Sequence, residues 1–217
     1  MLVEKRMSHP VVTVQSDMPI HDALQLIRQE SIRRLPVVNP QGKMIGIVSE
    51  RDLLHAEPSD VTSLSVWELN YLLTRITVDE VMTSEVITVN EDTPIEEAAR
   101  IMADHKIGGL PVMRGEELVG IITETDLFKI FLELLGAREP GVRITALLRN
   151  TPGELMKLTT AIADIKGNIV AMGQFLGESS ENRSVTLKVA GVTKKALEKA
   201  VKPVVEALID IRETAIT

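Results

Sequence analysis

The chain has 217 residues with a formal net charge of −7 and only 2% aromatic residues, so two domains with aliphatic cores are expected. The absence of cysteine excludes disulfides, thiolate metal ligands and a cysteine nucleophile, and the acidic charge argues against nucleic acid as a partner. No apolar stretch is long enough to span a bilayer and no signal peptide begins the chain, so we expect a cytoplasmic protein without a membrane partner.

An internal repeat occupies the N-terminal part of the chain. The segments that start at Met7 and Met82 align, and each reads as a strand ("VVTV", "VITV"), a helix opened by proline, two β-rich runs and a second helix. In the second copy, Thr93 and Glu96 also form a capping-box pattern. The first helix has apolar residues at the spacing of one buried face, namely Ile20, Ala23, Leu24 and Ile27. We therefore predict two β-α-β-β-α units that pack together with approximate two-fold symmetry and bind a ligand in the cleft between them.

The second helix of each copy begins with nearly the same hexapeptide, "SERDLL" and "TETDLF". One interpretation is a helix cap, in which Ser49 or Thr123 and the acid three residues later satisfy backbone N–H groups. The other is a ligand site, in which the hydroxyl approaches a phosphate and Asp52 or Asp126 binds a ribose diol. The sequence leaves both interpretations open.

The segments "IRRLPV" and "KIGGLPV" precede a strand in each copy. Ile32 and Ile107 are candidates for an apolar slot that holds a base. The copies differ in charge, because the first contains Arg33, Arg34 and Arg51, whereas the second has Gly108 and Gly109. We hypothesise that the first site prefers the more highly phosphorylated nucleotide; the alternative is that these arginines lie on a solvated turn.

Taken together, the repeated pattern, "GIVSERDL" and "DEVMT" resemble a tandem pair of CBS domains, the module that binds adenosine-containing ligands. The resemblance covers about residues 1 to 138, with repeats at 1–61 and 81–138. It implies that Asp52 and Asp126 hold ribose and that Ser49 and Thr123 approach phosphate. It also implies that Ile32–Pro36 and Ile107–Pro111 contact the base. The candidate nucleotide-binding residues are Thr13, Ile32, Arg33, Arg34, Pro36, Ser49, Arg51, Asp52, Thr88, Ile107, Gly108, Gly109, Pro111, Thr123 and Asp126.

A spacer at 62–80 separates the copies. Trp67 and Tyr71 are four residues apart and would share one helix face, which predicts a buried bridging helix or, alternatively, a dimer contact. The stretch "SVWELNYLL" resembles the equivalent spacer of the acetoin utilisation B-type regulatory proteins.

The C-terminal part, residues 141–217, has the predicted order βαββαβ, which gives an antiparallel ferredoxin-like sheet with both helices on one face. This order, "NTPGEL" and "KGNI" resemble an ACT domain, a regulatory module that often binds amino acids between subunits. The resemblance implies a ligand loop at Asn150, Thr151, Pro152, Gly153, Gly167 and Asn168. The alternative is a simple capping box formed by Thr151 and Glu154, with Pro152 at the first helical position.

Sequence motifs for catalysis are missing. The four histidines are dispersed without metal-ligand spacing, and the chain has no P-loop, G-x-S-x-G or G-x-G-x-x-G motif. We therefore predict a non-enzymatic α/β regulatory sensor that needs no cofactor and no metal. Its regulatory ligand would be an adenine nucleotide or an adenosyl compound. Its expected partners are a second copy and an unknown target protein, and an amino acid is a further candidate ligand. The alternatives are a structural oligomerisation adaptor without ligand and a subunit with an unrecognised enzymatic activity.

Overall fold

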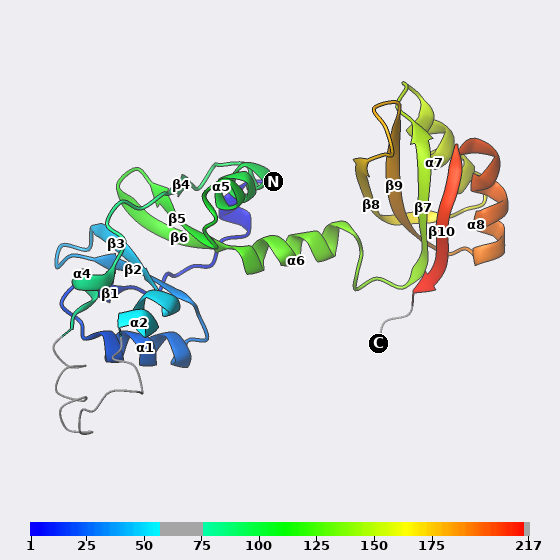
Figure 1. Cartoon of the computed structure of the whole chain (residues 1–217). Helices are drawn as coiled ribbons and strands as arrows, with labels where there is room; N and C mark the ends of the chain where they lie inside the picture. Colours follow the sequence, from blue (N-terminus) through cyan, green and yellow to red (C-terminus); the bar gives the residue numbers. More distant parts are fainter. Residues whose placement is uncertain (57–75, 215–217) are drawn as a thin grey trace. The chain divides into compact units, whose positions relative to one another are not determined.

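The structure is a computed structural model that describes residues 1–56 and 76–214 (Figure 1). They belong to two compact units, Met1–Leu127 and Phe128–Thr217. The predicted bridging helix, with Trp67 and Tyr71, lies almost entirely outside the described residues. None of the helices in the described ranges has the length and apolar composition needed to cross a membrane.

The first unit contains two repeats with the same order of elements. The first repeat consists of β1 (Val14–Gln15), α1 (Ile20–Gln29), β2 (Arg34–Val38), β3 (Met44–Ser49) and α2 (Glu50–Ala56). The second consists of β4 (Val89–Asn90), α5 (Ile95–His105), β5 (Gly109–Arg114), β6 (Glu117–Thr123) and α6 (Glu124–Leu134), whose residues from Phe128 on belong to the second unit. In each sheet the first strand runs parallel to the second and the second antiparallel to the third. The predicted β-α-β-β-α order is confirmed.

The apolar periodicity predicted the buried face of α1 correctly. Ile20, Ala23, Leu24 and Ile27 are each at most 2% exposed. Two local predictions need correction. The first strand of each repeat has only two paired residues, and the capping box of Thr93 is wrong. Pro94 is the N-cap of α5, so the Thr93 hydroxyl lies one residue too early and instead accepts a hydrogen bond from the N–H of Asn90 at 3.1 Å.

The segment before each repeat packs on the other repeat. The short helix η1 (Val3–Lys5) contributes Val3 to the core of the second repeat, and α4 (Val78–Val81) contributes Val78 to the core of the first. The chain then pairs with the third strand of that other repeat, Ser8 with Ile121 and Thr83 with Ile47. This reciprocal exchange joins the two repeats into one unit.

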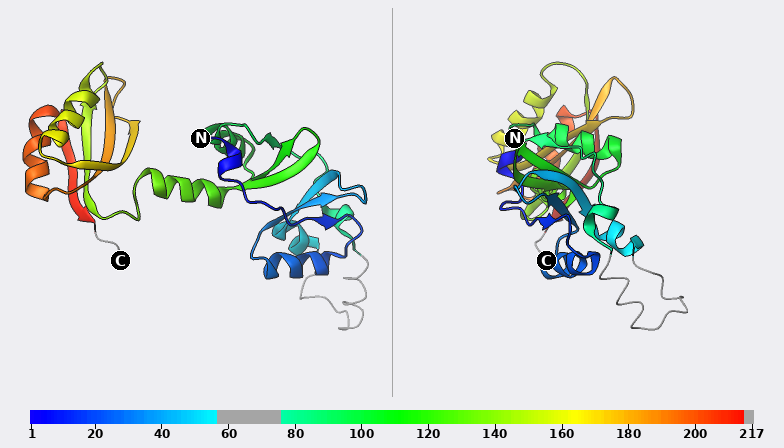
Figure 2. Two further views of the ribbon diagram at one scale, coloured as in Figure 1. Left: turned by 180° about the vertical axis from the view of Figure 1, so that it is seen from behind. Right: turned by 90° about the vertical axis from the view of Figure 1, so that its left-hand side faces the viewer.

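The second unit is a four-stranded antiparallel sheet with the strand order β10-β7-β9-β8. Its elements are β7 (Gly141–Arg149), α7 (Glu154–Asp164), β8 (Asn168–Leu176), β9 (Asn182–Ala190), α8 (Lys194–Val201), η2 (Lys202–Val204) and β10 (Ala207–Thr214). Both helices cover the same face of the sheet (Figure 2), where Leu158 and Leu197 pack with Ile144 and Leu187 in one core. The predicted βαββαβ order is confirmed.

Candidate functional site

Both hexapeptides form helix caps. The N–H and the hydroxyl of Ser49 donate to Oδ2 of Asp52 at 2.9 Å and 2.6 Å. Thr123 makes the same two bonds to Oδ2 of Asp126, at 3.0 Å and 2.7 Å. The capping interpretation is therefore confirmed in both repeats, and any ligand must bind to residues that already hold this geometry.

The helix before each candidate base segment ends with a left-handed residue. Ser31 after α1 and Lys106 after α5 have φ values of 53° and 55°. The next residues, Ile32 and Ile107, donate their N–H groups to Ile27 and Met102, five residues earlier, which is the bond pattern of a Schellman motif. Both isoleucines consequently pack against the cores and fix where the following strands begin.

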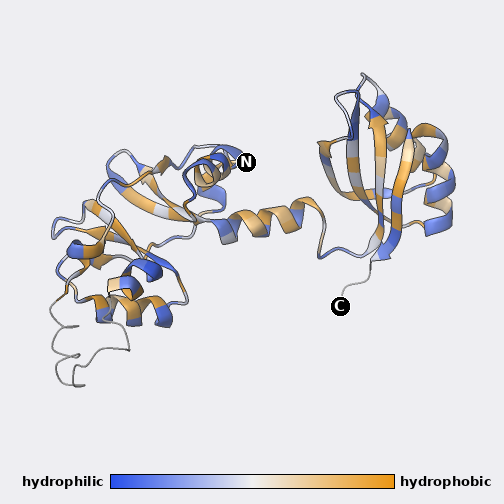
Figure 3. Cartoon of the chain, in the orientation of Figure 1, coloured by the Kyte–Doolittle hydropathy of each residue, from blue (hydrophilic) through white to orange (hydrophobic). Residues whose placement is uncertain are grey.

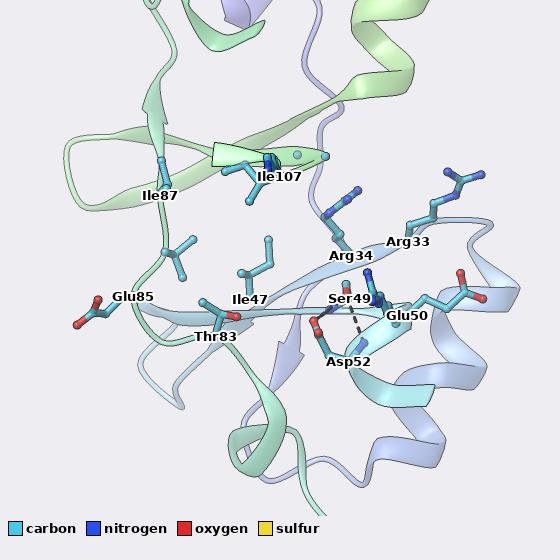
Figure 4. A pocket seen from close by; sticks show the side chains of 15 residues that line it. Arg33, Arg34, Ile47, Ser49, Glu50, Asp52, Thr83, Glu85, Ile87 and Ile107 are labelled. Atoms are coloured by element: carbon cyan, nitrogen blue, oxygen red, sulfur yellow. Dashed lines mark hydrogen bonds between the residues drawn. The ribbon is translucent and has the colours of Figure 1, made fainter. Parts of the chain in front are cut away.

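A cavity of about 550 Å³ lies between the two repeats (Figure 4). Eight of the predicted nucleotide-binding residues line it: Arg33, Arg34, Ser49, Arg51, Asp52, Ile107, Gly108 and Gly109. Seven further residues complete the lining: Ile47, Glu50, Thr83, Glu85, Val86, Ile87 and Lys106. Its volume is in the range of small-molecule sites, and its wall combines isoleucines with convergent charged groups.

Arg33 and Arg34 of the first repeat line the same cavity as Gly108 and Gly109 of the second. From the sequence, the two pairs were expected in separate sites. Arg34 reaches across to the second repeat, where its Nη2 atom occupies the space that a β-carbon on Gly108 would need. A β-carbon on Gly109 would lie 3.4 Å from Cδ of Arg34. The two pairs are equivalent positions of the two repeats, and they face each other where the repeats meet.

The cavity has a mixed but slightly basic lining. Arg33, Arg34, Arg51 and Lys106 are opposed by three acidic residues, Glu50, Asp52 and Glu85. Burial lowers the pKa of the Arg34 guanidinium, and Arg33 acts in the same direction, whereas Glu124 and Asp52 counteract the shift. The Arg34 guanidinium is thus partly removed from water and lies between two carboxylates that favour its charged form.

Other predicted residues lie outside this cavity. Thr13 lines a separate hollow of about 650 Å³ and Thr88 one of about 410 Å³. Pro36 and Pro111 are buried in β2 and β5, opposite Ile47 and Ile121, and Ile32 packs on the core of the first repeat. Thr123 and Asp126 do not line the cavity between the repeats, and Asp126 is 7% exposed.

In the second unit, a hollow of about 390 Å³ is lined by the predicted loop residues Asn150, Thr151, Pro152 and Gly153. Gly167 and Asn168 lie elsewhere. Asn168 pairs with Ala190 at one end of β9, whereas the loop follows Arg149, which pairs with Asn182 at the other end.

The predicted capping box of Thr151 and Glu154 needs correction. Helix α7 begins only at Glu154, and its N-cap is Gly153 with φ +89° and no side-chain capping bond. Lys157 donates a hydrogen bond to Glu154 at 2.6 Å and thereby lowers the pKa of that carboxyl group.

Sequence reasoning missed four neighbouring lining residues, namely Thr83, Glu85, Val86 and Ile87. They reach the first repeat through the pairing of Thr83 with Ile47, a contact between the start of one repeat and the third strand of the other. The alignment of the repeats shows that Met82 is equivalent to Met7. Nothing in the sequence of either segment shows that the segment packs on the other repeat.

The geometry defines a pair of intertwined β-α-β-β-α repeats with a ligand-sized cavity at their boundary. Family comparison agrees: the model for the CBS domain matches residues 3–59 and 78–133, about half of the chain. The chain belongs to the CBS domain family.

Several relatives share this pair of repeats. A CBS domain-containing protein of Dictyostelium discoideum is 32% identical over 135 residues, which cover 62% of this chain and 93% of the relative. The L-aspartate semialdehyde sulfurtransferase of Methanocaldococcus jannaschii is 30% identical over 131 residues, but the match covers 60% of this chain and only 23% of that enzyme. CBS pairs therefore occur both in small proteins and as parts of larger enzymes.

Solved structures are similar over the same region. The CBS domain pair of protein MJ0100, in complex with 5′-methylthioadenosine and S-adenosyl-L-methionine, is 31% identical with a TM-score of 0.51 and covers 60% of this chain and 95% of that one. A candidate acetoin utilization protein (AcuB) from Vibrio cholerae is 35% identical with a TM-score of 0.53, and it covers 64% of this chain and 96% of that one.

Proposed function

We propose that this protein is a regulatory sensor that binds one adenosine-containing ligand in the cavity between its CBS repeats. The observation that carries the proposal is the convergence of the Ser49–Asp52 cap with apolar side chains from both repeats on that cavity. The complex of the MJ0100 CBS pair with two adenosyl ligands supports this ligand class.

Each part of the ligand has a suitable group in the wall. Both hydrogen bonds from Ser49 go to Oδ2 of Asp52, so Oδ1 is the oxygen that accepts the ribose hydroxyls. Ile47, Ile87 and Ile107 provide aliphatic surface for the base (Figure 4). The arginines beside Asp52 suit a phosphate, since guanidinium groups bind phosphate oxygens in bidentate geometry.

The test is calorimetric titration and thermal unfolding with AMP, ATP, 5′-methylthioadenosine and S-adenosylmethionine. Saturation at 100 times the dissociation constant adds about 2.7 kcal/mol to the free energy of unfolding, a rise in melting temperature of roughly 2 to 4 °C per kcal/mol. Asp52→Asn removes a charged hydrogen-bond acceptor and should weaken binding about tenfold or more. Asp126→Asn is the matched control, because it perturbs the equivalent cap outside the cavity and should leave affinity nearly unchanged.

The outcomes separate the candidate functions. Loss of binding with Asp52→Asn but not with Asp126→Asn supports the sensor. If none of the four ligands changes the melting temperature, the sensor proposal fails and the structural adaptor becomes the better interpretation. The proposal assigns no enzymatic reaction to this chain; the target protein is unknown, and a cytoplasmic location stays a prediction.

For the second unit we propose an ACT-type role as the dimerisation module. The βαββαβ order and the hollow at Asn150–Gly153 support the family, and exposed apolar residues on β8 and α6 support self-association. Ligand binding would then act by linkage, shifting the population of domain packings that the target protein recognises. Two likenesses support acetoin utilization as the regulated process: the spacer resembles that of acetoin utilisation B-type proteins, and the chain is 35% identical to the AcuB structure from Vibrio cholerae.

A further inference from the structure

The side chains of Arg34 and Glu124, which belong to different repeats, both reach the space above Gly108. Arg34 is the first residue of β2, and its Nη2 atom occupies the position that a β-carbon on Gly108 would take. The Oε2 atom of Glu124 would lie 2.7 Å from that same β-carbon. A guanidinium nitrogen and a carboxylate oxygen therefore converge above the backbone of Gly108.

Arg34 also faces the candidate ligand cavity. It lines the wall together with Ser49 and Asp52, and its side chain points from the first repeat toward the second (Figure 4). Glu124 and Asp52 are the two carboxylates that favour its charged form against burial. One cation is thus attracted by an acid of each repeat.

The two repeats differ at the position that makes this arrangement possible. Gly108 is equivalent to Arg33, and Gly109 to Arg34, so the second repeat has no side chains where the first has two arginines. Only a residue without a β-carbon leaves room for Arg34 at Gly108. The second repeat accordingly contributes space and the Glu124 carboxylate, whereas the first contributes the cation.

We propose that Glu124 is a specificity-determining residue of the adenosine cavity, because it attracts Arg34 and so weakens the hold of Arg34 on an anionic ligand beside Asp52. The inference rests on the proposed function and adds the charge preference of the site. A ligand phosphate competes with the Glu124 carboxylate for one guanidinium, while an uncharged adenosine ligand does not. The second repeat thus tunes the affinity of a site whose ribose anchor, Asp52, belongs to the first.

Glu50 provides a matched control. It is equivalent to Glu124, and the N–H groups of both residues donate to the chain before the second strand, Glu50 to the carbonyl of Arg33 at 2.9 Å and Glu124 to that of Gly108 at 3.2 Å. The charges that shift the pKa of Arg34 are those of Glu124, Arg33 and Asp52, and Glu50 is not one of them. Neutralising either acid removes one negative charge near the cavity, but only Glu124 should act through Arg34.

The experiment is calorimetric titration of AMP and of uncharged 5′-methylthioadenosine into the full chain, at one fixed salt concentration. The proteins are the wild type, Glu124→Gln, Glu50→Gln, Arg34→Gln and the two double variants with Arg34→Gln. Glu124→Gln should tighten AMP binding about three- to tenfold, as expected for loss of one partly screened charge interaction, and leave 5′-methylthioadenosine unchanged. The gain should vanish in the Arg34→Gln background, whereas any effect of Glu50→Gln should be the same in both backgrounds.

Two results would overturn the inference while leaving the proposed function intact. In the first, both ligands bind and Glu124→Gln binds AMP with the affinity of the wild type. In the second, the gain in AMP affinity from Glu124→Gln persists in the Arg34→Gln background. If neither ligand binds the wild-type chain, the proposed function fails and this inference fails with it. Glu124 is exposed, so its neutral variant should fold as the wild type does, which thermal unfolding without ligand checks.

Discussion

Gly46 of β3 and Gly120 of β6 are points where the segment that precedes the other repeat approaches closely. A β-carbon on Gly46 would collide with Sδ of Met82 and lie 3.1 Å from the carbonyl oxygen of Thr83. Gly120 faces Met7 in the same way. A methionine packs directly on each glycine, and this contact seats the incoming segment on the other repeat.

Gly46→Ala should therefore destabilise the first unit by overpacking. We expect a decrease of about 1 to 3 kcal/mol in the free energy of unfolding, measured by urea denaturation. The matched variant is Gly46→Ala combined with Met82→Ala, which removes the colliding sulfur. Its cost should be smaller than the sum of the two single changes. Additive costs would show that Met82 moves away freely and that the contact does not position the segment.

The candidate site was only partly predictable from single residues. Ser49, Asp52 and the segments around Arg34 and Gly108 were found because the repeat displays them twice. The sequence does not show which parts of the two repeats face each other, because that depends on pairs of residues far apart in the chain, such as Thr83 with Ile47. As a result it assigned Arg34 and Gly108 to different sites, although they line one cavity.

At the scale of elements, α6 ends in a motif that ties it to the second unit. The N–H groups of Gly136 and Ala137 donate to Glu133 and Leu132, the bonds of a Schellman motif. Lys188 of β9 is only 4% exposed, and its ammonium group donates to the carbonyls of Gly136 at 2.6 Å and Glu139 at 2.8 Å. One buried cation holds the chain between α6 and β7.

Lys188→Met keeps most of the aliphatic volume but removes the ammonium donor from both carbonyls, of which that of Gly136 keeps only the N–H of Glu139 at 3.0 Å. The free energy of unfolding should fall by about 1 to 3 kcal/mol, the loss expected for hydrogen bonds from a buried charged donor. Hydrogen exchange should accelerate in the last turn of α6. Lys195→Met, at an exposed position of α8, is the control and should change neither quantity. Unchanged exchange in the Lys188 variant would contradict a role in holding the end of α6.

Element order was the most predictable level of this fold. The periodicity of α1 and the β-rich runs of the second unit are local signals, and the structure confirms them. Helix starts were less predictable. Thr93 and Thr151 both precede a proline in an apparent capping sequence, yet the helices begin after Pro94 and after Gly153. Capping patterns specify a nearby start, and the backbone around proline and glycine decides which residue becomes the N-cap.

At the scale of the whole molecule, apolar residues lie exposed on the second unit. The chain has three phenylalanines, and all are exposed: Phe128 at 67%, Phe131 at 47% and Phe175 at 42%. These three rings alone expose roughly 300 Å². Leu135, just after α6, lies close to Gly173 of the edge strand β8, and α6 itself is mostly apolar (Figure 3). Exposed apolar residues that gather in one patch normally mark an interface.

The two edge strands of the second unit differ in a way that points to β8 as the interface with a second copy. β8 contains no charged residue and exposes Met172, Phe175 and Leu176, whereas β10 carries Asp210, Arg212 and Glu213. Edge strands that stay in solvent usually carry charges that prevent pairing. Antiparallel pairing of β8 with β8 of another copy would satisfy its free backbone groups and cover its apolar side chains.

Leu176→Lys should therefore weaken dimerisation, because it places a charge on a self-complementary apolar edge. Leu176 is 83% exposed, so the change should not affect folding of the single chain. Sedimentation velocity over a range of protein concentrations should show a dimer dissociation constant raised about tenfold or more. Ile209→Lys is the control, since Ile209 is 54% exposed on the opposite edge strand. If Ile209→Lys dissociates the dimer and Leu176→Lys does not, the interface is formed by β10, and the charges of that strand then serve pairing and not its prevention.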